Sequence, residues 1–359
     1  MITRFVWPLE LPLTAKGVLA VLLVVASQYH FWSKLSSGSV FSPEFPRALV
    51  IVFNWAFGAI FLLALMQLLL DAATLVAMVL HGGGVRVPDG VRYAIGGVAA
   101  LAAAIGVQQA IRVPPLKEVA IGIAGLPPQF DGYTMIQLTD LHISRLFPAR
   151  WVRAVVDKTN ALGADLIVIT GDLIDGAVAS RRDDVAPLSD LRAADGVYAI
   201  PGNHEYFFDY QARMQYFTAM GLHMLANDHA VIDRGGAKLI VAGVTDASAQ
   251  RAAQPGPDLA AALRGVPMGA PVILLDHQPK NAAHAASRGV ALQLSGHTHG
   301  GLVAGLDRLA APANGGYVSG IYTIGAMTLY VNNGTALWPG FALRLGRPSE
   351  LTRMTLRTL

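Results

Sequence analysis

Three long apolar runs in the first third of the sequence restrict the possible folds of this chain more than any other feature. They cover residues 9–31, 48–80 and 93–111. A helix needs roughly 20 predominantly apolar residues to cross a bilayer, and the runs reach that length, the first only with its flanks. We therefore predict a transmembrane region of about three helices within residues 1–111.

The second run is longer than a single span requires, and no turn signal interrupts it between Ala48 and Leu80. We expect one long helix that tilts in the membrane or emerges from it, rather than two short helices. Asp71 lies within this run. Two interpretations of Asp71 remain open, an interfacial charge and a buried charge with a functional role.

The composition of the chain agrees with a part that lies in lipid. Its 359 residues are 53% hydrophobic and only 14% charged, and three long runs with so few charges rarely occur together in a soluble core. No block of like charges of the kind that binds nucleic acid occurs, so no nucleic-acid partner is expected. The chain has no cysteine, which excludes disulfides, thiolate zinc sites and a cysteine nucleophile.

The character of the sequence changes at Arg112. Residues 112–130, which include Pro114 and Pro115, are predicted as a linker, and residues 131–359 as one domain. Short β-rich runs then alternate with helical patterns, which is typical of a layered α/β fold. The expected strands cover residues 133–138, 166–169, 196–200, 239–244, 272–275 and 292–294, with a helix over 149–162 and a hairpin turn over 233–236.

Polar motifs follow five of the expected strands. They are Thr139-Asp140-Leu141-His142, Thr170-Gly171-Asp172, Gly202-Asn203-His204-Glu205, Asp276-His277-Gln278-Pro279 and Gly296-His297-Thr298-His299-Gly300-Gly301. In layered α/β folds the carboxyl ends of the strands form one crevice, so we expect the motifs to build one site. Asp, Asn and His are ligands for Mn, Fe, Zn, Co or Mg ions, and one carboxylate can bridge two ions about 3.5–4 Å apart. Each motif alone is weak evidence, whereas the five in this order indicate a two-metal centre.

This order of motifs resembles that of the calcineurin-like metallophosphoesterases, from about residue 131 to the C-terminus. The likeness is greatest to the membrane-anchored bacterial branch and its animal transmembrane relatives, which place hydrophobic helices before the same domain. The stretches 329–334 and 347–351 look like the C-terminal pattern of that branch. Leu302 departs from the pattern, because relatives usually carry Gln after the double glycine, and this change concerns a substrate-side contact.

The resemblance implies a four-layer α-β-β-α domain, in which two mixed sheets pack face to face and helices flank them. The ligands that it implies are Asp140, His142, Asp172 and His299 for a first metal, and Asp172, Asn203, His277 and His297 for a second. Asp172 would thus bridge the two metals, and His204 would be the catalytic residue that faces the leaving group. The cofactors would be two divalent or trivalent ions, with Mn, Fe and Zn as the foremost choices.

The predicted function is that of a membrane-anchored phosphoesterase of the phosphodiesterase or pyrophosphohydrolase type. The two ions would lower the pKa of a bridging water, and the hydroxide would attack a phosphate ester or anhydride, which could be lipid-linked. His204 would donate a proton to the leaving group. The alternative is a non-catalytic metal-binding scaffold, or a regulatory membrane protein, with the same fold.

We expect a multi-pass protein of the bacterial inner membrane, with the catalytic domain on the periplasmic side. Three spans with an inward N-terminus, and exported relatives of the branch, favour that side. The positive-inside rule does not decide the orientation. Four basic residues would lie on each side: Arg4, Lys16, Arg86 and Arg92 on one, and Lys34, Arg47, Arg112 and Lys117 on the other.

Overall fold

The computed structural model describes residues 1–359, and the chain divides into two compact units. One unit contains Met1–Ile111 together with Pro339–Leu345, and the other contains Arg112–Trp338 together with Gly346–Leu359. The boundary after Ile111 coincides with the change in sequence character at Arg112. The predicted domain division did not include the short segment Pro339–Leu345 in the first unit.

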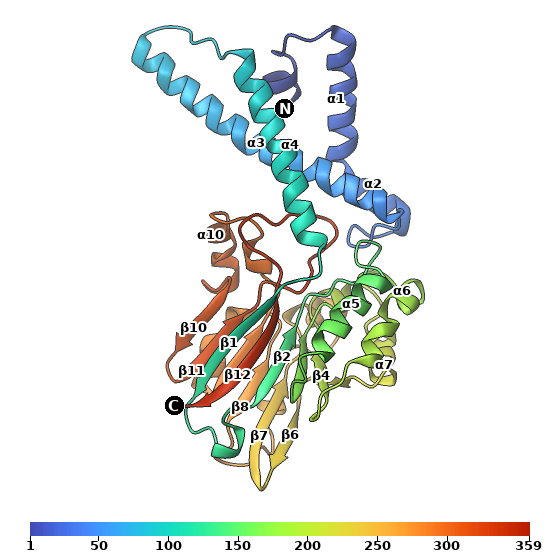
Figure 1. The fold of residues 1–359 in the computed structure, drawn as a ribbon, viewed down its shortest axis with the longest axis vertical. Coiled ribbons are helices and arrows are strands. Elements are labelled where there is room, and N and C mark those ends of the chain that lie inside the picture. Colours follow the sequence, from blue (N-terminus) through green and yellow to red (C-terminus); the bar gives the residue numbers. More distant parts are fainter. The chain divides into compact units, whose positions relative to one another are not determined.

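The first unit is helical (Figure 1). After a short π-helix, Ile2–Val6, it contains α1 (Leu13–Ser27), α2 (Tyr29–Ser37), α3 (Arg47–His81) and α4 (Asp89–Ile111). Helices α3 and α4 are long and apolar enough to cross a membrane. Helices α1 and α2 meet at an angle of 53° and provide a third candidate span only if the bent pair counts as one.

The apolar runs of the sequence therefore differ in how they fold. The second run forms the single long helix α3, as predicted. The first run bends at Gln28, whose φ of −91° and ψ of 19° leave the helical range where polar side chains interrupt the apolar sequence. Asp71 on α3 accepts hydrogen bonds from Arg4 and Gln67. This partly exposed ion pair favours the interpretation of Asp71 as an interfacial charge.

The segment Pro339–Leu345 completes the helical unit. The Nδ2 atom of Asn54 on α3 donates a hydrogen bond to the carbonyl of Pro339 over 2.8 Å. Its Oδ1 atom accepts one from the N–H of Ala342 over 2.6 Å. A polar residue within an apolar helix thus binds the backbone of a segment that is distant in sequence.

The second unit contains two six-stranded mixed sheets (Figure 1). The strand order of the first is β1-β12-β2-β3-β4-β5, with bounds Leu116–Ile123, Leu351–Thr358, Thr134–Leu138, Leu166–Thr170, Val197–Ile200 and His223–Met224. The strand order of the second is β10-β11-β9-β8-β7-β6, with bounds Gly320–Ile324, Met327–Val331, Leu292–Ser295, Val272–Leu275, Ala237–Gly243 and Asp228–Arg234. Strands β2 to β5 are parallel in the first sheet, and β7, β8, β9 and β11 in the second. Their carboxyl ends therefore meet at one edge of each sheet.

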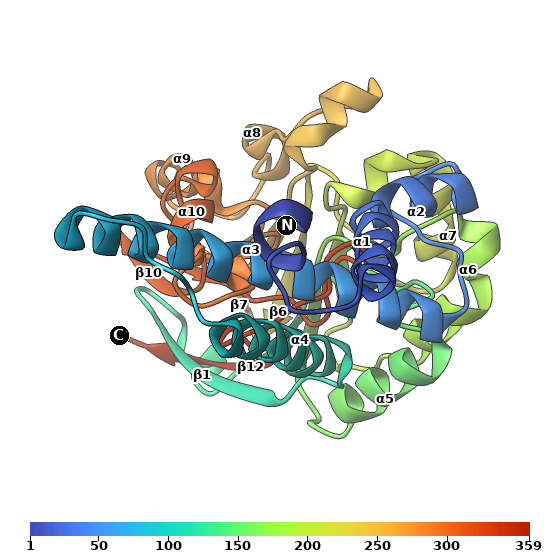
Figure 2. The same ribbon diagram turned by 90° about the horizontal axis from the view of Figure 1, so that it is seen from above.

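Helices flank the two sheets, with α5 to α7 on one side of the strands and α8 and α9 on the other (Figure 2). Their bounds are Ala149–Asn160, Val178–Val185 and Tyr210–Ala219 for α5 to α7, and Leu259–Ala262, Ala282–Ser287 and Asp307–Ala310 for α8 to α10. Short 3-10 turns occupy Pro128–Phe130, Ala186–Asp190, His204–Phe207, Ala247–Ala252, Pro279–Asn281, His299–Gly301 and Pro312–Asn314. This arrangement confirms the predicted α/β fold class, with two mixed sheets flanked by helices.

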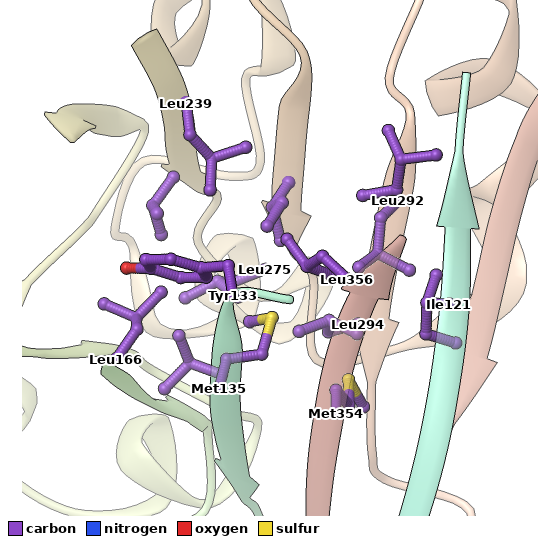
Figure 3. Close-up of a cluster of buried hydrophobic side chains, with 14 of the residues drawn as sticks. Ile121, Tyr133, Met135, Leu166, Leu239, Leu275, Leu292, Leu294, Met354 and Leu356 are labelled. Atoms are coloured by element: carbon purple, nitrogen blue, oxygen red, sulfur yellow. The ribbon is translucent and has the colours of Figure 1, made fainter. Parts of the chain in front are cut away.

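The main core lies between the two sheets, which both contribute apolar side chains to it (Figure 3). Among these fully buried residues are Met135, Leu166 and Met354 from the first sheet and Leu239, Leu275 and Leu292 from the second. A second cluster covers the other face of the second sheet, where α8 and α9 pack. Burial of apolar surface is the dominant stabilising term in folding, so the strands give firm support to the loops at their ends.

The predicted strands and helix match β2, β3, β4, β7, β8, β9 and α5 within a few residues. The predicted turn joins β6 to β7, with both Gly235 and Gly236 at positive φ. Residues 112–130, for which a linker was expected, contain β1, which pairs in parallel with β12. The reason for the difference is that β1 lies at the edge of the sheet, where exposed and charged positions weaken the strand pattern of the sequence.

Candidate metal centre

The polar motifs of the sequence lie where central strands of both sheets end. Strands β2, β3, β4, β8 and β9 lead directly into the segments that carry Asp140, Asp172, Asn203, His277 and His297. Ligand atoms of Asp140, Asp172 and His277 lie within 4.8 Å of one another, and all three residues are buried. The two sheets therefore bring motifs that are far apart in sequence into one site.

The backbone that carries the candidate ligands has an unusual conformation. Only eight non-glycine residues of the chain have positive φ. Five of them are candidate ligands, namely Asp140, His142, Asp172, His297 and His299. Such conformations cost about 1–3 kcal/mol each and concentrate at functional sites. The strained turns aim these side chains into the site, and their clustering indicates a function there.

Two glycines allow the strand ends to approach each other closely. A Cβ atom at Gly202 would overlap the carboxylate of Asp172. A Cβ atom at Gly296 would overlap the side chains of Thr139 and Asp140. Only glycine fits at these positions, so the glycines of the motifs serve the packing of the ligands themselves.

One group of candidate ligands surrounds Asp140 and His142, which are both fully buried. The Nε2 atom of His142 lies 4.0 Å from Oδ1 of Asp140 and 3.6 Å from Oδ2 of Asp172. The Nε2 atom of His299 lies 3.7 Å from Oδ1 of Asp140. These separations are too long for hydrogen bonds. They suit donor atoms that face a common ion.

A second group of candidate ligands surrounds His277. Its Nε2 atom lies 3.3 Å from Oδ2 of Asp172 and 3.0 Å from Oδ1 of Asn203. The Nδ1 atom of His297 lies 2.9 Å from the same Oδ1 atom of Asn203. The carboxylate of Asp172 therefore faces both groups, which is the position that a bridging ligand needs.

Hydrogen bonds orient the imidazole rings of both groups. The Nδ1 atom of His277 lies 2.7 Å from the carbonyl oxygen of Thr170. A carbonyl can only accept, so Nδ1 carries a proton, and Nε2 is the nitrogen that faces Asp172 and Asn203 and would bind a metal. The Nε2 atom of His142 is buried and has no hydrogen-bond partner. A buried nitrogen without a partner is rare, and a metal ion would satisfy it.

A carboxylate outside the predicted ligand set, Asp175, orients two of the histidines. Its Oδ2 atom lies 3.1 Å from Nδ1 of His142, and its Oδ1 atom lies 2.5 Å from Nδ1 of His204. Such a carboxylate behind an imidazole is typical of metal-binding histidines. The spacing of Asp172 and Asp175, three residues apart after a buried strand, is the signal in the sequence that could have identified Asp175.

Glu205 holds the turn that carries Asp172. It is fully buried, and its carboxylate accepts hydrogen bonds from the backbone N–H groups of Asp172, Leu173 and Gly202. Glu205 belongs to one of the polar motifs of the sequence, but no role is predicted for it from the sequence alone. It fixes the loops after β3 and β4 relative to each other, and thereby positions Asp172.

His204 lies beside the first group of ligands. Its ring centroid is 4.6 Å from that of His142, and its backbone N–H donates to Oδ1 of Asp172 over 2.8 Å. One of its ring nitrogens also lies within 4.8 Å of ligand atoms of His142 and Asp172. The prediction that His204 faces the leaving group, rather than a metal, therefore stays a prediction.

The buried carboxylates and imidazoles of the site shift each other's pKa values. Burial alone would lower the pKa of His142, but the carboxylates of Asp175, Asp172 and Asp140 outweigh it and raise the pKa to about 9. Burial alone would raise the pKa of Asp172, but the imidazoles of His277 and His204 outweigh it and hold the pKa well below its usual value. The buried carboxylates therefore need positive charge beside them, which either protonated imidazoles or bound cations can provide.

These observations fit divalent metal binding. The donor set consists of carboxylate oxygens, an amide oxygen and imidazole nitrogens, which first-row transition metals accept. The rings of His142 and His277 are oriented by hydrogen bonds at Nδ1. The Nε2 atom of His142 is left without a partner.

A cavity of about 520 Å³ borders the site, and both Asn203 and His297 line it. Tyr206, Phe207 and Arg251 belong to the same lining. Ligand-binding pockets of proteins commonly have volumes of about 300–1,000 Å³. The candidate ligands therefore border a space that is large enough for a substrate.

The sequence matches the family model of the calcineurin-like phosphoesterases over residues 133–301, a range that contains every candidate ligand. The transmembrane protein with metallophosphoesterase domain of Danio rerio is 32% identical over 269 residues, which are 72% of this chain and 61% of that protein. An uncharacterized metallophosphoesterase of Helicobacter pylori is 32% identical over 253 residues, which are 70% of this chain and 66% of that protein. The chain thus spans less than two thirds of the length of these two relatives. An uncharacterized metallophosphoesterase of Bacillus subtilis is 31% identical over 240 residues, which are 65% of this chain and 82% of that protein.

Proposed function

Because this chain belongs to the calcineurin-like metallophosphoesterases, and is therefore a metal-dependent phosphoester hydrolase, we propose that it works as a membrane-anchored enzyme with a dinuclear metal centre. The observation that carries the proposal is the position of Asp172, whose carboxylate faces the imidazoles of both His142 and His277. A shared carboxylate between two sets of donors is the arrangement that two-metal hydrolases require.

The two ions would be held by the donors of the two groups. The first set is Asp140, His142, Asp172 and His299, and the second is Asp172, Asn203, His277 and His297. When bound, such ions supply Lewis acidity at the phosphoryl oxygens and a water of lowered pKa. Mn, Fe and Zn suit this mixture of oxygen and nitrogen donors. The chain itself contributes the rigid, buried frame that keeps the donors in place.

His204 would act on the leaving group. Its Nδ1 atom is held by Asp175, which fixes the ring and directs the other side of the imidazole towards the site. A positioned imidazole can donate a proton to the departing oxygen, which contributes about 10²–10⁴-fold to a rate. Phe207 lies next to it, with ring centroids 4.8 Å apart, and provides an apolar wall for the leaving group.

The helical unit would anchor the enzyme in a membrane. Its apolar helices α3 and α4, and a relative described as a transmembrane protein, indicate membrane association. We further propose residues 1–111 as the transmembrane region and residues 131–359 as the catalytic domain, in a multi-pass protein of the bacterial inner membrane with a periplasmic catalytic domain. An enzyme that is held at the bilayer meets lipid-linked phosphates readily, so such a substrate is consistent with the anchor.

The test uses the full-length chain in detergent, supplied with Mn²⁺. We expect it to hydrolyse bis-p-nitrophenyl phosphate and to bind two ions per chain by elemental analysis. Asp172→Ala should lose both the activity and the bound metal. Asp157→Ala, which removes an exposed aspartate of α5, is the matched control and should change neither. A wild-type chain that binds no metal would contradict the proposal, and so would activity that persists in Asp172→Ala.

A further inference from the structure

The lining of the cavity beside the candidate metal centre contains positively charged side chains and no negatively charged one. Arg251 and Lys280 both line it, and no carboxylate is among the lining residues. Neither side chain has an ion-pair or hydrogen-bond partner within the chain. Lys280 interacts electrostatically with Asp276, but that carboxylate is buried and does not line the cavity. The two cations are therefore available to an anion that enters the cavity.

The carboxylate of Asp246 does not compensate these cations. Asp246 is buried and caps the 3-10 turn Ala247–Ala252, which carries Arg251. Its oxygens accept hydrogen bonds from the N–H of Ser248 over 2.7 Å and from Nε2 of Gln278 over 2.8 Å. Neutral donors thus satisfy Asp246, and its role is to fix the turn on which Arg251 stands.

The same cavity connects the two cations to the candidate metal ligands. Asn203 and His297 line it together with Arg251 and Lys280. A substrate whose reacting phosphorus lies at the metal ligands would therefore extend past both cations. A substrate with a single negative charge, located at the metals, would leave the two cations without a partner.

We propose that Arg251 and Lys280 form a second anion-binding subsite, and that the substrate is a diphosphate diester rather than a phosphodiester with one phosphate. The reacting phosphate would lie at the metal centre and the neighbouring phosphate at the two cations. Guanidinium and ammonium groups form strong charge-assisted hydrogen bonds with phosphate oxygens. This inference rests on the proposed hydrolase function and specifies its substrate class.

The first experiment compares turnover of UDP-glucose, a diphosphate diester, with turnover of bis-p-nitrophenyl phosphate. It uses the full-length chain in detergent with Mn²⁺. In the double variant Arg251→Ala, Lys280→Ala we expect kcat/KM for UDP-glucose to fall roughly tenfold to a hundredfold. The loss for bis-p-nitrophenyl phosphate should be clearly smaller. Equal losses would mean that the cations contact the reacting phosphate, and unchanged values would mean that they bind no substrate; either result overturns the proposal.

The control is the double variant Lys238→Ala, Arg288→Ala, which removes two exposed cations that do not line the cavity. It has the same change in net charge, so we expect both substrates to be turned over as in the wild type. A loss of UDP-glucose turnover in this control as large as in the cavity variant would show a general effect of charge. That result would also overturn the subsite.

A binding measurement separates the subsite from the hydrolase function. Calorimetry in the presence of Mn²⁺ compares α,β-methylene-UDP, which carries two phosphorus groups and is not cleaved, with UMP, which carries one. We expect tighter binding of the methylene compound by the wild type, and a loss of this preference in the cavity variant. If no substrate is hydrolysed but the preference exists, the proposed function fails while the subsite stands. If bis-p-nitrophenyl phosphate is hydrolysed but no preference exists, the subsite fails while the hydrolase stands.

Discussion

One buried polar side chain of the helical unit, Asn54, and one of the catalytic unit, His142, differ in whether their polar atoms have hydrogen-bond partners. In the helical unit, both polar atoms of the buried Asn54 have hydrogen-bond partners in the backbone of Pro339–Leu345. In the catalytic unit, the fully buried His142 has an Nε2 atom without a hydrogen-bond partner. An unsatisfied buried polar group costs about 1–3 kcal/mol. The satisfied Asn54 therefore indicates a structural role, whereas the unsatisfied Nε2 atom of His142, which faces Asp140 and Asp172, indicates a place for a ligand.

The glycines of the two units show the same contrast. In the helical unit, Gly58 and Gly106 make room for the side chain of Leu343. In the catalytic unit, Gly202 and Gly296 make room for carboxylates of candidate metal ligands. All eight non-glycine residues with positive φ also lie in the catalytic unit. Close packing without backbone strain serves stability, whereas close packing with strain accompanies the arrangement of reactive groups.

The largest effect that tests this comparison is expected for His204→Ala. The variant removes the proposed proton donor, so we expect kcat to fall by about 10²–10⁴-fold while the bound metal is retained. Turnover of bis-p-nitrophenyl phosphate and elemental analysis of the full-length chain measure the two quantities. His284→Ala, at an exposed histidine of α9, serves as the control. Loss of metal together with activity would make His204 a ligand and would contradict its proposed role.

A smaller effect is expected for Asp175→Asn. Asparagine has nearly the same shape but only one accepting atom, so it cannot accept hydrogen bonds from both His142 and His204 as Asp175 does. Loss of such an orienting carboxylate typically costs about 10–100-fold in metal affinity or activity. Metal titration and kcat/KM measure this loss, and circular dichroism should show an unchanged fold. An unchanged metal affinity together with an unchanged kcat/KM would remove Asp175 from the site.

The sequence predicted that the polar motifs lie together because each of them follows a recognisable strand, while the choice of individual ligands came from the resemblance to the family. The buried strands β3 and β8 have continuous apolar sequences, and Asp172 and His277 come directly after them. Local pattern and the geometry of sheet edges were sufficient to place these side chains in one site. The role of Asp175 could not be predicted in this way, because it depends on which imidazoles face its carboxylate. The packing of loops that are separate in sequence determines these contacts.

The partner of Asn54 could not be predicted for a related reason. Asn54 and Pro339 are 285 positions apart, and no local pattern connects a polar residue in an apolar helix with a distant backbone carbonyl. The edge strand β1 was missed because its exposed positions alternate with partly buried ones, and Pro114 and Pro115 before it resemble a linker. In both units, contacts between residues that are distant in sequence could therefore not be predicted from local sequence patterns.

The structural side of the comparison is tested by Asn54→Leu. This variant leaves the N–H of Ala342 without the acceptor that it has in Asn54. The unfolding free energy in detergent should fall by about 1–3 kcal/mol. We expect a lower Tm by circular dichroism but unchanged metal content, because Asn54 contacts no candidate ligand. Gln28→Leu, at an exposed amide between α1 and α2, is the control. Loss of metal in Asn54→Leu would show that the helical unit influences the metal centre and would break the comparison.

The smallest effect concerns Asp165, a fully partnered carboxylate of the catalytic unit. Its oxygens accept hydrogen bonds from Arg234 over 2.8 Å and from the N–H of Thr134 over 2.7 Å. Burial alone would raise the pKa of Asp165, but these bonds outweigh it and lower the pKa. Asp165 lies in the catalytic unit but, like Asn54, has hydrogen-bond partners. If these partners, and not the location in the catalytic unit, determine its role, a substitution of Asp165 should change stability and leave the metal centre unchanged.

We therefore expect Asp165→Asn to reduce the unfolding free energy near pH 7 by less than about 1 kcal/mol, because the ion pair is partly exposed. A lowered pKa in the folded state gives stability that is complete above the unfolded pKa of about 3.9 and is lost as the pH falls through the folded pKa. The difference in Tm between wild type and variant should accordingly shrink at acid pH. A difference that grows on acidification would reverse the sign of this linkage. If Asp165→Asn lost its bound metal, a carboxylate whose oxygens all have hydrogen-bond partners would still support the metal centre. Hydrogen-bond satisfaction alone would then no longer distinguish structural from functional polar groups.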